Sequence, residues 1–106
     1  MKQPPEYKQV ERYTPTDRKE KQLIRAFSLL NDEKIASAFL RDLLTQAEIE
    51  EFANRLEIVF LLKKGWSYLD IAKKTNVSTT TVTRVAHWFF HGCGGYKTIV
   101  DKLSAS

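Results

Sequence analysis

Residues that interrupt or cross-link a chain are scarce in this sequence of 106 residues, which contains one Cys, three Pro and four Gly. With only Cys93, the chain cannot form an intramolecular disulfide, and this excludes a disulfide-stabilised secreted domain. All the prolines lie before residue 16, and three of the glycines lie between residues 92 and 95. Most of the chain between these two regions is therefore free to form helices.

Long apolar segments are absent as well. No run approaches the roughly 20 apolar residues that a membrane-spanning helix needs, and the N-terminal MKQPPEYKQ lacks the apolar segment of a signal peptide. Together with the lone cysteine, these absences predict a cytoplasmic protein with no membrane partner. Apolar residues still make up 42% of the chain, so we expect a packed core, and the length suits one domain.

Charge is unevenly distributed along the chain. The net charge is +4 overall, but residues 61–106 carry 7 cationic and 2 anionic side chains, whereas residues 26–60 carry 3 and 7. A basic C-terminal part favours a polyanionic partner such as nucleic acid. A solvated basic face without a partner is the alternative.

Helical periodicity begins after a polar start that holds all the prolines. We expect residues 1–15 to form a flexible N-terminal arm and residues 16–106 to form a single helical domain. Apolar residues recur there at intervals of three and four. They predict helices over 17–31, 33–43 and 45–64, and a short last helix over 96–103.

Capping residues mark where the first three helices are expected to begin. Thr16 and Asp32 stand at the first two starts, and Thr45 with Glu48 has the spacing of a capping box at the third. Gly65 is placed to end the third helix. No alternating strand pattern occurs, so the predicted fold class is all-α with about six helices.

Residues 67–91 have the pattern of a helix-turn-helix motif. Ser67 and Ser78 are N-cap residues for two helices, Ala72 is small where their backbones would approach, and Asn76 tolerates the left-handed conformation of the turn. The apolar anchors at the expected offsets are Ile71, Val77, Val82 and Val85. The second, DNA-contacting helix of the motif is therefore predicted to start after Ser78.

Hydroxyl side chains are concentrated at the start of this second helix. Ser or Thr occupies five of the six positions 78–83, although threonine is a poor residue for an exposed helix. Hydroxyls bond phosphates and base edges, and a threonine methyl packs on thymine. We therefore predict double-stranded DNA as the partner, contacted by Lys73, Lys74, Ser78, Thr79, Thr80, Thr81, Thr83 and Arg84. The alternative is a DNA-independent protein-interaction module that keeps the helix-turn-helix as a scaffold.

Three phrases between Asp42 and Gly92 are more specific: LLT at 43–45, RLEIV at 55–59 and VSTTTVTR at 77–84. This part of the chain resembles the tryptophan-repressor family. The resemblance implies an intertwined all-α homodimer that acts as a transcriptional repressor, with two recognition helices in successive major grooves of a palindromic operator. One small chain would leave the apolar stripes of the first three helices partly exposed to solvent. These stripes therefore favour a dimer over a monomer.

In that family two arginines and a helix start hold tryptophan as corepressor, and the matching positions here are Arg55, Arg84 and Thr45. Two positions depart from the family's pattern, with Val85 in place of a glycine and Trp88 in place of a serine. A branched side chain and a second indole take up the room that a flat ring needs, and overpacking costs about 1–3 kcal/mol. We therefore expect no tryptophan corepressor and no cofactor, with Val85 and Trp88 filling the pocket permanently.

His87 and His91 stand four residues apart with Cys93 nearby, a spacing that suits zinc ligands on one helix face. The chain has no further His or Cys, so we predict no metal site and interpret the histidines as helix-end residues, with Gly92 ending the helix. No catalytic triad, paired carboxylates or phosphate loop occurs. We expect a regulator and not an enzyme.

Overall fold

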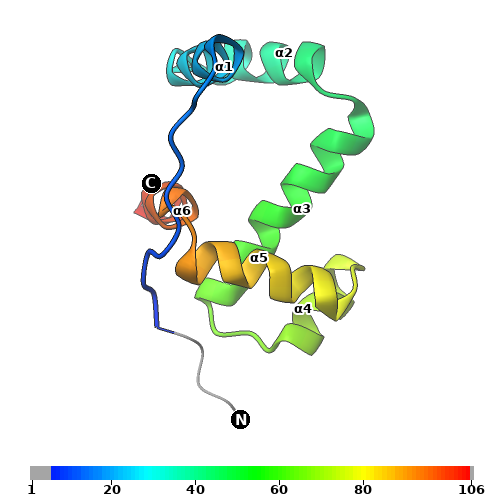
Figure 1. The fold of residues 1–106 in the computed structure, drawn as a ribbon. Helices are drawn as coiled ribbons and strands as arrows, with labels where there is room; N and C mark the ends of the chain where they lie inside the picture. The colour runs from blue at the N-terminus through cyan, green and yellow to red at the C-terminus, as the bar shows by residue number, and fades with distance from the viewer. Residues whose placement is uncertain (1–5, 106) are drawn as a thin grey trace. The chain divides into compact units, whose positions relative to one another are not determined.

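The computed structural model describes residues 6–105, which form six α-helices and no strand (Figure 1). The helices are α1 (Arg18–Ser28), α2 (Glu33–Leu43), α3 (Gln46–Lys63), α4 (Tyr68–Thr75), α5 (Thr79–His91) and α6 (Gly95–Ala105). The predicted all-α class and the six helices are confirmed. None of these helices combines the length and the apolar character that crossing a membrane requires.

The first helices begin at short polar side chains, and one of these differs from the prediction. Asp17, not Thr16, is the N-cap of α1, because its carboxylate accepts a hydrogen bond from the backbone N–H of Glu20 at 2.8 Å. The Thr16 hydroxyl instead donates to the Glu20 carboxylate at 3.4 Å. A carboxylate is a strong N-cap acceptor and also interacts favourably with the helix dipole. The prediction of Asp32 as the cap of α2 is confirmed.

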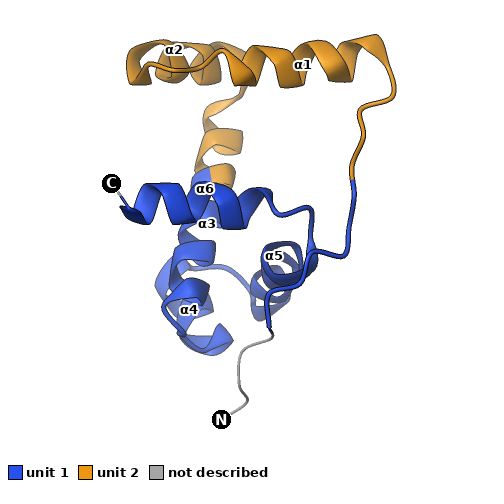
Figure 2. Cartoon of the chain, turned by 90° about the vertical axis from the view of Figure 1, so that its left-hand side faces the viewer, with its two compact units in different colours: residues 1–12, 53–106 blue, residues 13–52 orange. Residues whose placement is uncertain are grey.

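The chain forms two compact units (Figure 2), and the single domain expected over 16–106 stays a prediction. Unit 1 contains the described residues 6–12 and 53–105, and unit 2 contains residues 13–52. The boundary falls inside α3. Burial explains the division, because every buried apolar side chain of the described residues belongs to unit 1, whereas α1 and α2 bury none.

Unit 2 keeps much of its apolar surface exposed within one chain. The rings of Phe27 and Phe39 meet edge to face, with centroids 5.9 Å apart. Large apolar residues of this unit that remain exposed include Leu23, Ile24, Phe27, Leu29, Ile35, Leu43 and Phe52. Contiguous apolar surface is uncommon on a monomer in water, so unit 2 has helix faces that its own packing does not cover.

Unit 1 is built around one apolar core to which α3, α4, α5 and α6 all contribute. The buried core residues are Ile58, Val59, Leu61, Leu62, Ile71, Ala72, Val82, Val85, Ala86, Phe89, Phe90 and Val100. α5 packs against both α4 and α6, and it supplies more of these residues than any other helix. The core therefore fixes α5 from one side.

The turn between α4 and α5 has the geometry predicted for the motif. Asn76 ends α4 in the left-handed conformation, with φ 58° and ψ 42°, and the N–H of Val77 donates to the carbonyl of Ala72 at 3.1 Å. Ala72 is buried, as expected where two helices approach. Gly65 likewise follows α3 with a φ of 85°. The predicted turn and both of its flanking helices are confirmed.

The described part of the N-terminal segment, residues 6–16, contains no helix or strand. We expected residues 1–15 to be a flexible arm, of which residues 1–5 lie outside the described residues. Residues 8–11, in contrast, are hydrogen-bonded to the end of α5, so this part of the segment is held within unit 1. The bonds use backbone groups, which leave no periodic pattern in a sequence.

We predict that Asn76→Ala lowers the free energy of unfolding by about 1–2 kcal/mol, because an ordinary Cβ-bearing residue resists the left-handed conformation. Asn76→Gly should stay within about 0.5 kcal/mol of the parent chain, since glycine accepts positive φ without strain. Urea unfolding followed by circular dichroism, at matched protein concentrations, measures both changes. Equal stability of the two variants would contradict this role of Asn76.

Candidate nucleic-acid interface

The candidate interface begins at Ser78, the N-cap of α5. Its hydroxyl accepts a hydrogen bond from the backbone N–H of Thr81 at 3.1 Å and lies 3.1 Å from the Thr81 hydroxyl. Ser67 caps α4 in the same way, by accepting from the backbone N–H of Asp70. Both predicted caps are confirmed, and they fix where the first turn of each helix begins.

One face of α5 is buried and the other presents polar side chains. The buried face consists of Val82, Val85, Ala86, Phe89 and Phe90. The exposed residues of the first turns are Thr79, Thr80, Thr83 and Arg84. Among the eight predicted contact residues, Thr81 is half-buried and the others are exposed. The core thus holds α5 from one side and leaves its hydroxyl-bearing start on the surface.

The threonine hydroxyls of α5 are not equivalent as ligand groups. Thr83 donates its hydroxyl hydrogen to the carbonyl of Thr79 at 2.9 Å, and the Thr81 hydroxyl is bonded to Ser78. Within residues 6–105, the hydroxyls of Thr79 and Thr80 have no hydrogen-bond partner. Thr83 therefore offers a methyl group and acceptor lone pairs, whereas Thr79 and Thr80 offer complete hydroxyls.

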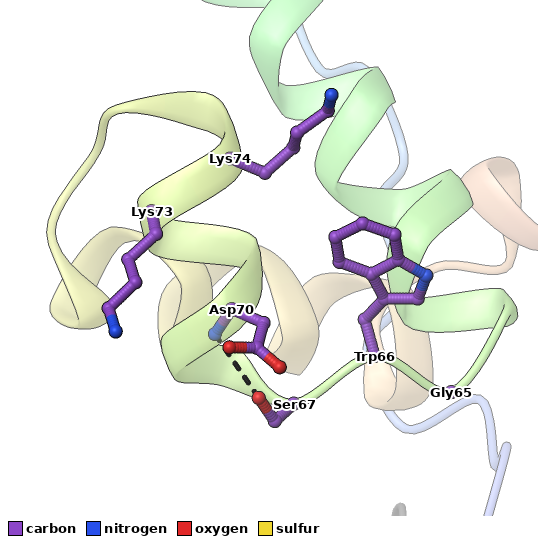
Figure 3. A pocket seen from close by; sticks show the side chains of 6 residues that line it. All are labelled: Gly65, Trp66, Ser67, Asp70, Lys73 and Lys74. Atoms are coloured by element: carbon purple, nitrogen blue, oxygen red, sulfur yellow. Dashed lines mark hydrogen bonds between the residues drawn. The ribbon is translucent and has the colours of Figure 1, made fainter.

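Lys73 and Lys74 lie in the last turn of α4, where they help to line an open pocket (Figure 3). The other lining residues are Gly65, Trp66, Ser67 and Asp70. The two lysine side chains diverge, with Lys74 on the side of Trp66. Both lysines are exposed. Because Asp70 is the one carboxylate of this lining, the pocket carries a net positive charge, which suits a phosphate backbone.

Sequence reasoning missed Trp66 as a residue of this surface. Its side chain is 40% exposed, and it lies between the end of α3 and the start of α4, beside Lys74. A connecting residue belongs to no helical stripe, so periodicity cannot assign it a face. The available signal was its position next to Gly65, where the left-handed backbone turns the chain.

Thr45, a predicted effector-pocket residue, is engaged in a capping box in unit 2. Its hydroxyl accepts from the N–H of Glu48 at 3.1 Å, and its own N–H donates to the Glu48 carboxylate at 2.9 Å. The hydrogen bond that the Glu48 carboxylate accepts from the Thr45 backbone, followed by its interaction with the Thr45 side chain, lowers the pKa of Glu48. The predicted capping box is confirmed, and it engages both the hydroxyl and the backbone N–H of Thr45.

The other predicted pocket residues belong to unit 1. Burial raises the pKa of Tyr96 on α6, and the positive charge of Arg55 on α3 partly offsets that rise. Arg84 is exposed on α5, next to the buried Val85. Unit 1 therefore contains both arginines of the expected pocket, each on a helix that contributes to the core.

Trp88, which we expected to fill a pocket together with Val85, is a surface residue within one chain, and the pocket itself stays a prediction. Within one chain its side chain is 45% exposed, and its ring lies against Gly92, where an added Cβ would come 2.9 Å from Cε3. His87 meets the ring edge to face, with centroids 5.4 Å apart. Val85 is buried in the core, whereas Trp88 lies on the surface of α5 within one chain.

His87, His91 and Cys93 do not come together as metal ligands. No group of three His, Cys, Asp or Glu side chains suited to a metal occurs among residues 6–105. His87 instead faces Glu11, with Nε2 3.8 Å from Oε1, and Cys93 is exposed. Gly92 is the C-cap of α5, as predicted.

Comparison with known proteins agrees with this geometry. The model of the family described as Trp repressor protein matches residues 19–104. The chain belongs to the Trp repressor family. A curated relative, the Uncharacterized protein YerC of Bacillus subtilis (strain 168), is 33% identical over 82 residues, which span 77% of this chain and 79% of the relative.

Two solved structures share the Trp repressor fold with this chain. A TrpR-like protein from Eubacterium eligens ATCC 27750 has a TM-score of 0.77 and 34% sequence identity, over 84% of this chain and 92% of that one. A putative Trp repressor from Staphylococcus aureus has a TM-score of 0.76 and 26% identity, over 86% and 91%. The resemblance found in the sequence is confirmed, and the Trp repressor family is one of regulators, not of enzymes.

Proposed function

We propose that this member of the Trp repressor family is a sequence-specific double-stranded DNA-binding transcriptional regulator, acting as a repressor. The observation that carries the proposal is the start of α5, where Thr79, Thr80 and Thr83 are exposed while the opposite face is buried in the core. A helix held in this way fits the second helix of a helix-turn-helix, which lies in the major groove with its first residues at the base edges.

The proposed contact residues have two roles: some position the protein on the DNA backbone, and others recognise the base sequence. Lys73 and Lys74, at the end of α4, suit contacts to phosphate that are independent of sequence. The hydroxyls of Thr79 and Thr80, free of internal bonds, suit base edges. Thr83 suits a thymine methyl, because its own hydroxyl hydrogen is bonded to the helix backbone.

The regulator is proposed to act as an intertwined homodimer. Unit 2 exposes large apolar residues along α1 and α2, including Leu29 at 71% and Ile35 at 55%. A second copy that covers these helices would remove the apolar surface from water, which stabilises an assembly by about 25 cal/mol per Å². Two recognition helices related by two-fold symmetry would then match a palindromic operator.

We predict that Thr80→Val weakens binding to an operator selected from random duplexes by roughly fivefold, since valine keeps the shape and loses a hydrogen bond of about 1 kcal/mol. The matched control is Thr83→Val, which should change affinity by less than about twofold because that hydroxyl hydrogen is bonded within α5. Fluorescence anisotropy measures both affinities.

The salt dependence supplies the second arm of this experiment. The affinity for DNA should fall steeply as the salt concentration rises. Lys74→Ala should make the slope of log K against log salt concentration shallower by about 0.9, the value for one phosphate contact, and should lower the affinity for all sequences to a similar extent. If the parent chain selected no duplex at all, the DNA-independent interaction module would replace this proposal.

We predict that Ile35→Glu raises the dissociation constant of the homodimer at least roughly tenfold. Ile35 would be buried by the second copy, where an isoleucine side chain contributes about 1.5–3 kcal/mol and a charged side chain would oppose association. Ser37→Glu, an exposed position on the same helix, is the matched control. Sedimentation equilibrium measures both. A monomeric parent chain would contradict the homodimer.

We predict that free tryptophan does not bind with micromolar affinity. The side chain of Val85, 5% exposed, takes up space where the family has glycine, and making room for a flat ring costs about 1–3 kcal/mol. Isothermal titration calorimetry tests this on the parent chain, with Val85→Gly as the variant that restores the space. Uptake of one tryptophan per parent chain at micromolar concentration would refute the prediction.

A further inference from the structure

The segment 7–11 lies against the C-terminal end of α5, although it is far from that end in sequence. The two ends of α5 are therefore capped by different means. We propose that these five residues form a docking strap that closes the end of α5 and so positions this helix for DNA. The DNA part of the inference rests on the proposed function, whereas the docking itself does not.

Backbone hydrogen bonds carry the docking. The last carbonyls of any α-helix lack intrahelical N–H partners. Here the N–H of Lys8 donates to the carbonyl of Phe90 at 2.8 Å, and those of Val10 and Glu11 donate to the carbonyl of His91 at 3.2 Å. The Glu11 N–H also reaches the carbonyl of Gly92 at 3.2 Å. The strap therefore supplies donors that the helix itself cannot supply.

Burial makes these donors difficult to replace. Phe90 and Gly92 are buried, and a buried carbonyl that loses its partner is left without water as a substitute. Undocking the strap would expose this end of the core or leave its carbonyls unpaired, and both outcomes cost free energy.

Side chains of the strap meet the corner between α5 and α6. A Cβ at Gly94 would lie 3.0 Å from the Tyr7 hydroxyl, so this hydroxyl lies close to that turn. The ammonium of Lys97 is 5.8 Å from the centroid of the same ring. Lys97 is also paired with Asp101, whose other oxygen lies 3.3 Å from the ammonium of Lys63 on α3. The strap thus contacts a charged cluster that ends at α3.

The side-chain contact between Glu11 of the strap and His87 of the helix contributes less than the backbone bonds. The Glu11 carboxylate lies 3.8 Å from Nε2 of His87, and their side chains are 45% and 49% exposed. Solvent screening leaves exposed pairs with little net effect. Loss of the Glu11 charge should therefore leave the strap docked, whereas loss of a backbone donor should not.

Chain connectivity gives the strap a further consequence. It precedes unit 2 directly, and α3 follows unit 2 into unit 1. Unit 2 is therefore joined to unit 1 at both of its ends, by the docked strap and by the continuous α3. Release of the strap would leave α3 as the one connection. It would also open the C-terminal end of α5, the helix whose N-terminal end presents Thr79 and Thr80.

The test compares Lys8→Pro, which removes the backbone N–H, with Lys8→Ala, which keeps it. Hydrogen exchange of the full chain should accelerate roughly two- to tenfold at Gly92 and Thr98 in the proline variant relative to the alanine variant. Exchange at Ile71 in α4 should not change. Glu11→Gln should match the alanine variant. Equal exchange in the proline and alanine variants, or an equally large effect of Glu11→Gln, would overturn the strap.

Binding to the selected operator forms the second readout. Lys8→Pro should raise the dissociation constant roughly two- to tenfold relative to Lys8→Ala, with non-specific binding unchanged. Faster exchange with unaltered specific affinity would refute the positioning role. If the parent chain selected no duplex, the proposed function would fail, while the exchange data would still decide whether the strap is docked.

A less invasive variant covers the case in which Lys8→Pro does not fold. An ester in place of the amide between Tyr7 and Lys8 removes the same N–H without introducing a ring. It should reproduce the faster exchange at Gly92, and unchanged exchange in the ester would count against the strap.

Discussion

The packing of α5 against the core of unit 1 is the constraint on which the candidate interface depends. Five of the six positions 78–83 are Ser or Thr, and each threonine costs a helix up to about 0.7 kcal/mol relative to alanine. Burial of an aliphatic or aromatic side chain contributes about 1.5–3 kcal/mol, and α5 buries five apolar residues. A few buried side chains therefore outweigh a polar start that would not form a helix by itself.

Unit 2 presents the opposite situation. Its helices α1 and α2 have 11 residues each and bury none of them, and isolated helices of this length are marginal in water. Their caps at Asp17 and Asp32 supply only part of what is missing, since a cap contributes about 1 kcal/mol. Burial of their apolar stripes against the proposed second copy would supply further stabilisation, and that copy would then belong to the fold as much as to the function.

Local signals account for what the sequence could predict. Some features depend only on residues within four positions of one another, so the side chains at those positions predict them. These features are the caps at Asp32, Thr45 and Ser78 and the left-handed turn at Asn76. The same reasoning misplaced the start of α1 by one residue, because Thr16 and Asp17 are both acceptable caps and only the geometry chooses between them.

Side-chain conformation, which residue spacing does not reveal, accounts for part of what the sequence could not predict. The spacing of Val85 and Trp88 does not show that one is buried and the other is 45% exposed. The division of threonine hydroxyls into bonded and unbonded groups depends on rotamers, as the bond from Thr83 to the carbonyl of Thr79 shows. Neither property alters residue spacing, so no pattern analysis detects it.

The two ends of α5 illustrate this difference most directly. Its start is capped by the side chain of the adjacent Ser78, whereas its end is paired with backbone N–H groups of residues 8–11. A backbone donor requires no particular side chain, only that the residue is not proline. The prolines at positions 4, 5 and 15 lie on either side of this segment and not within it. The absence of proline is thus the one sequence feature that such a strap requires. A segment whose sequence predicts an unstructured arm can therefore still be ordered at the end of a helix.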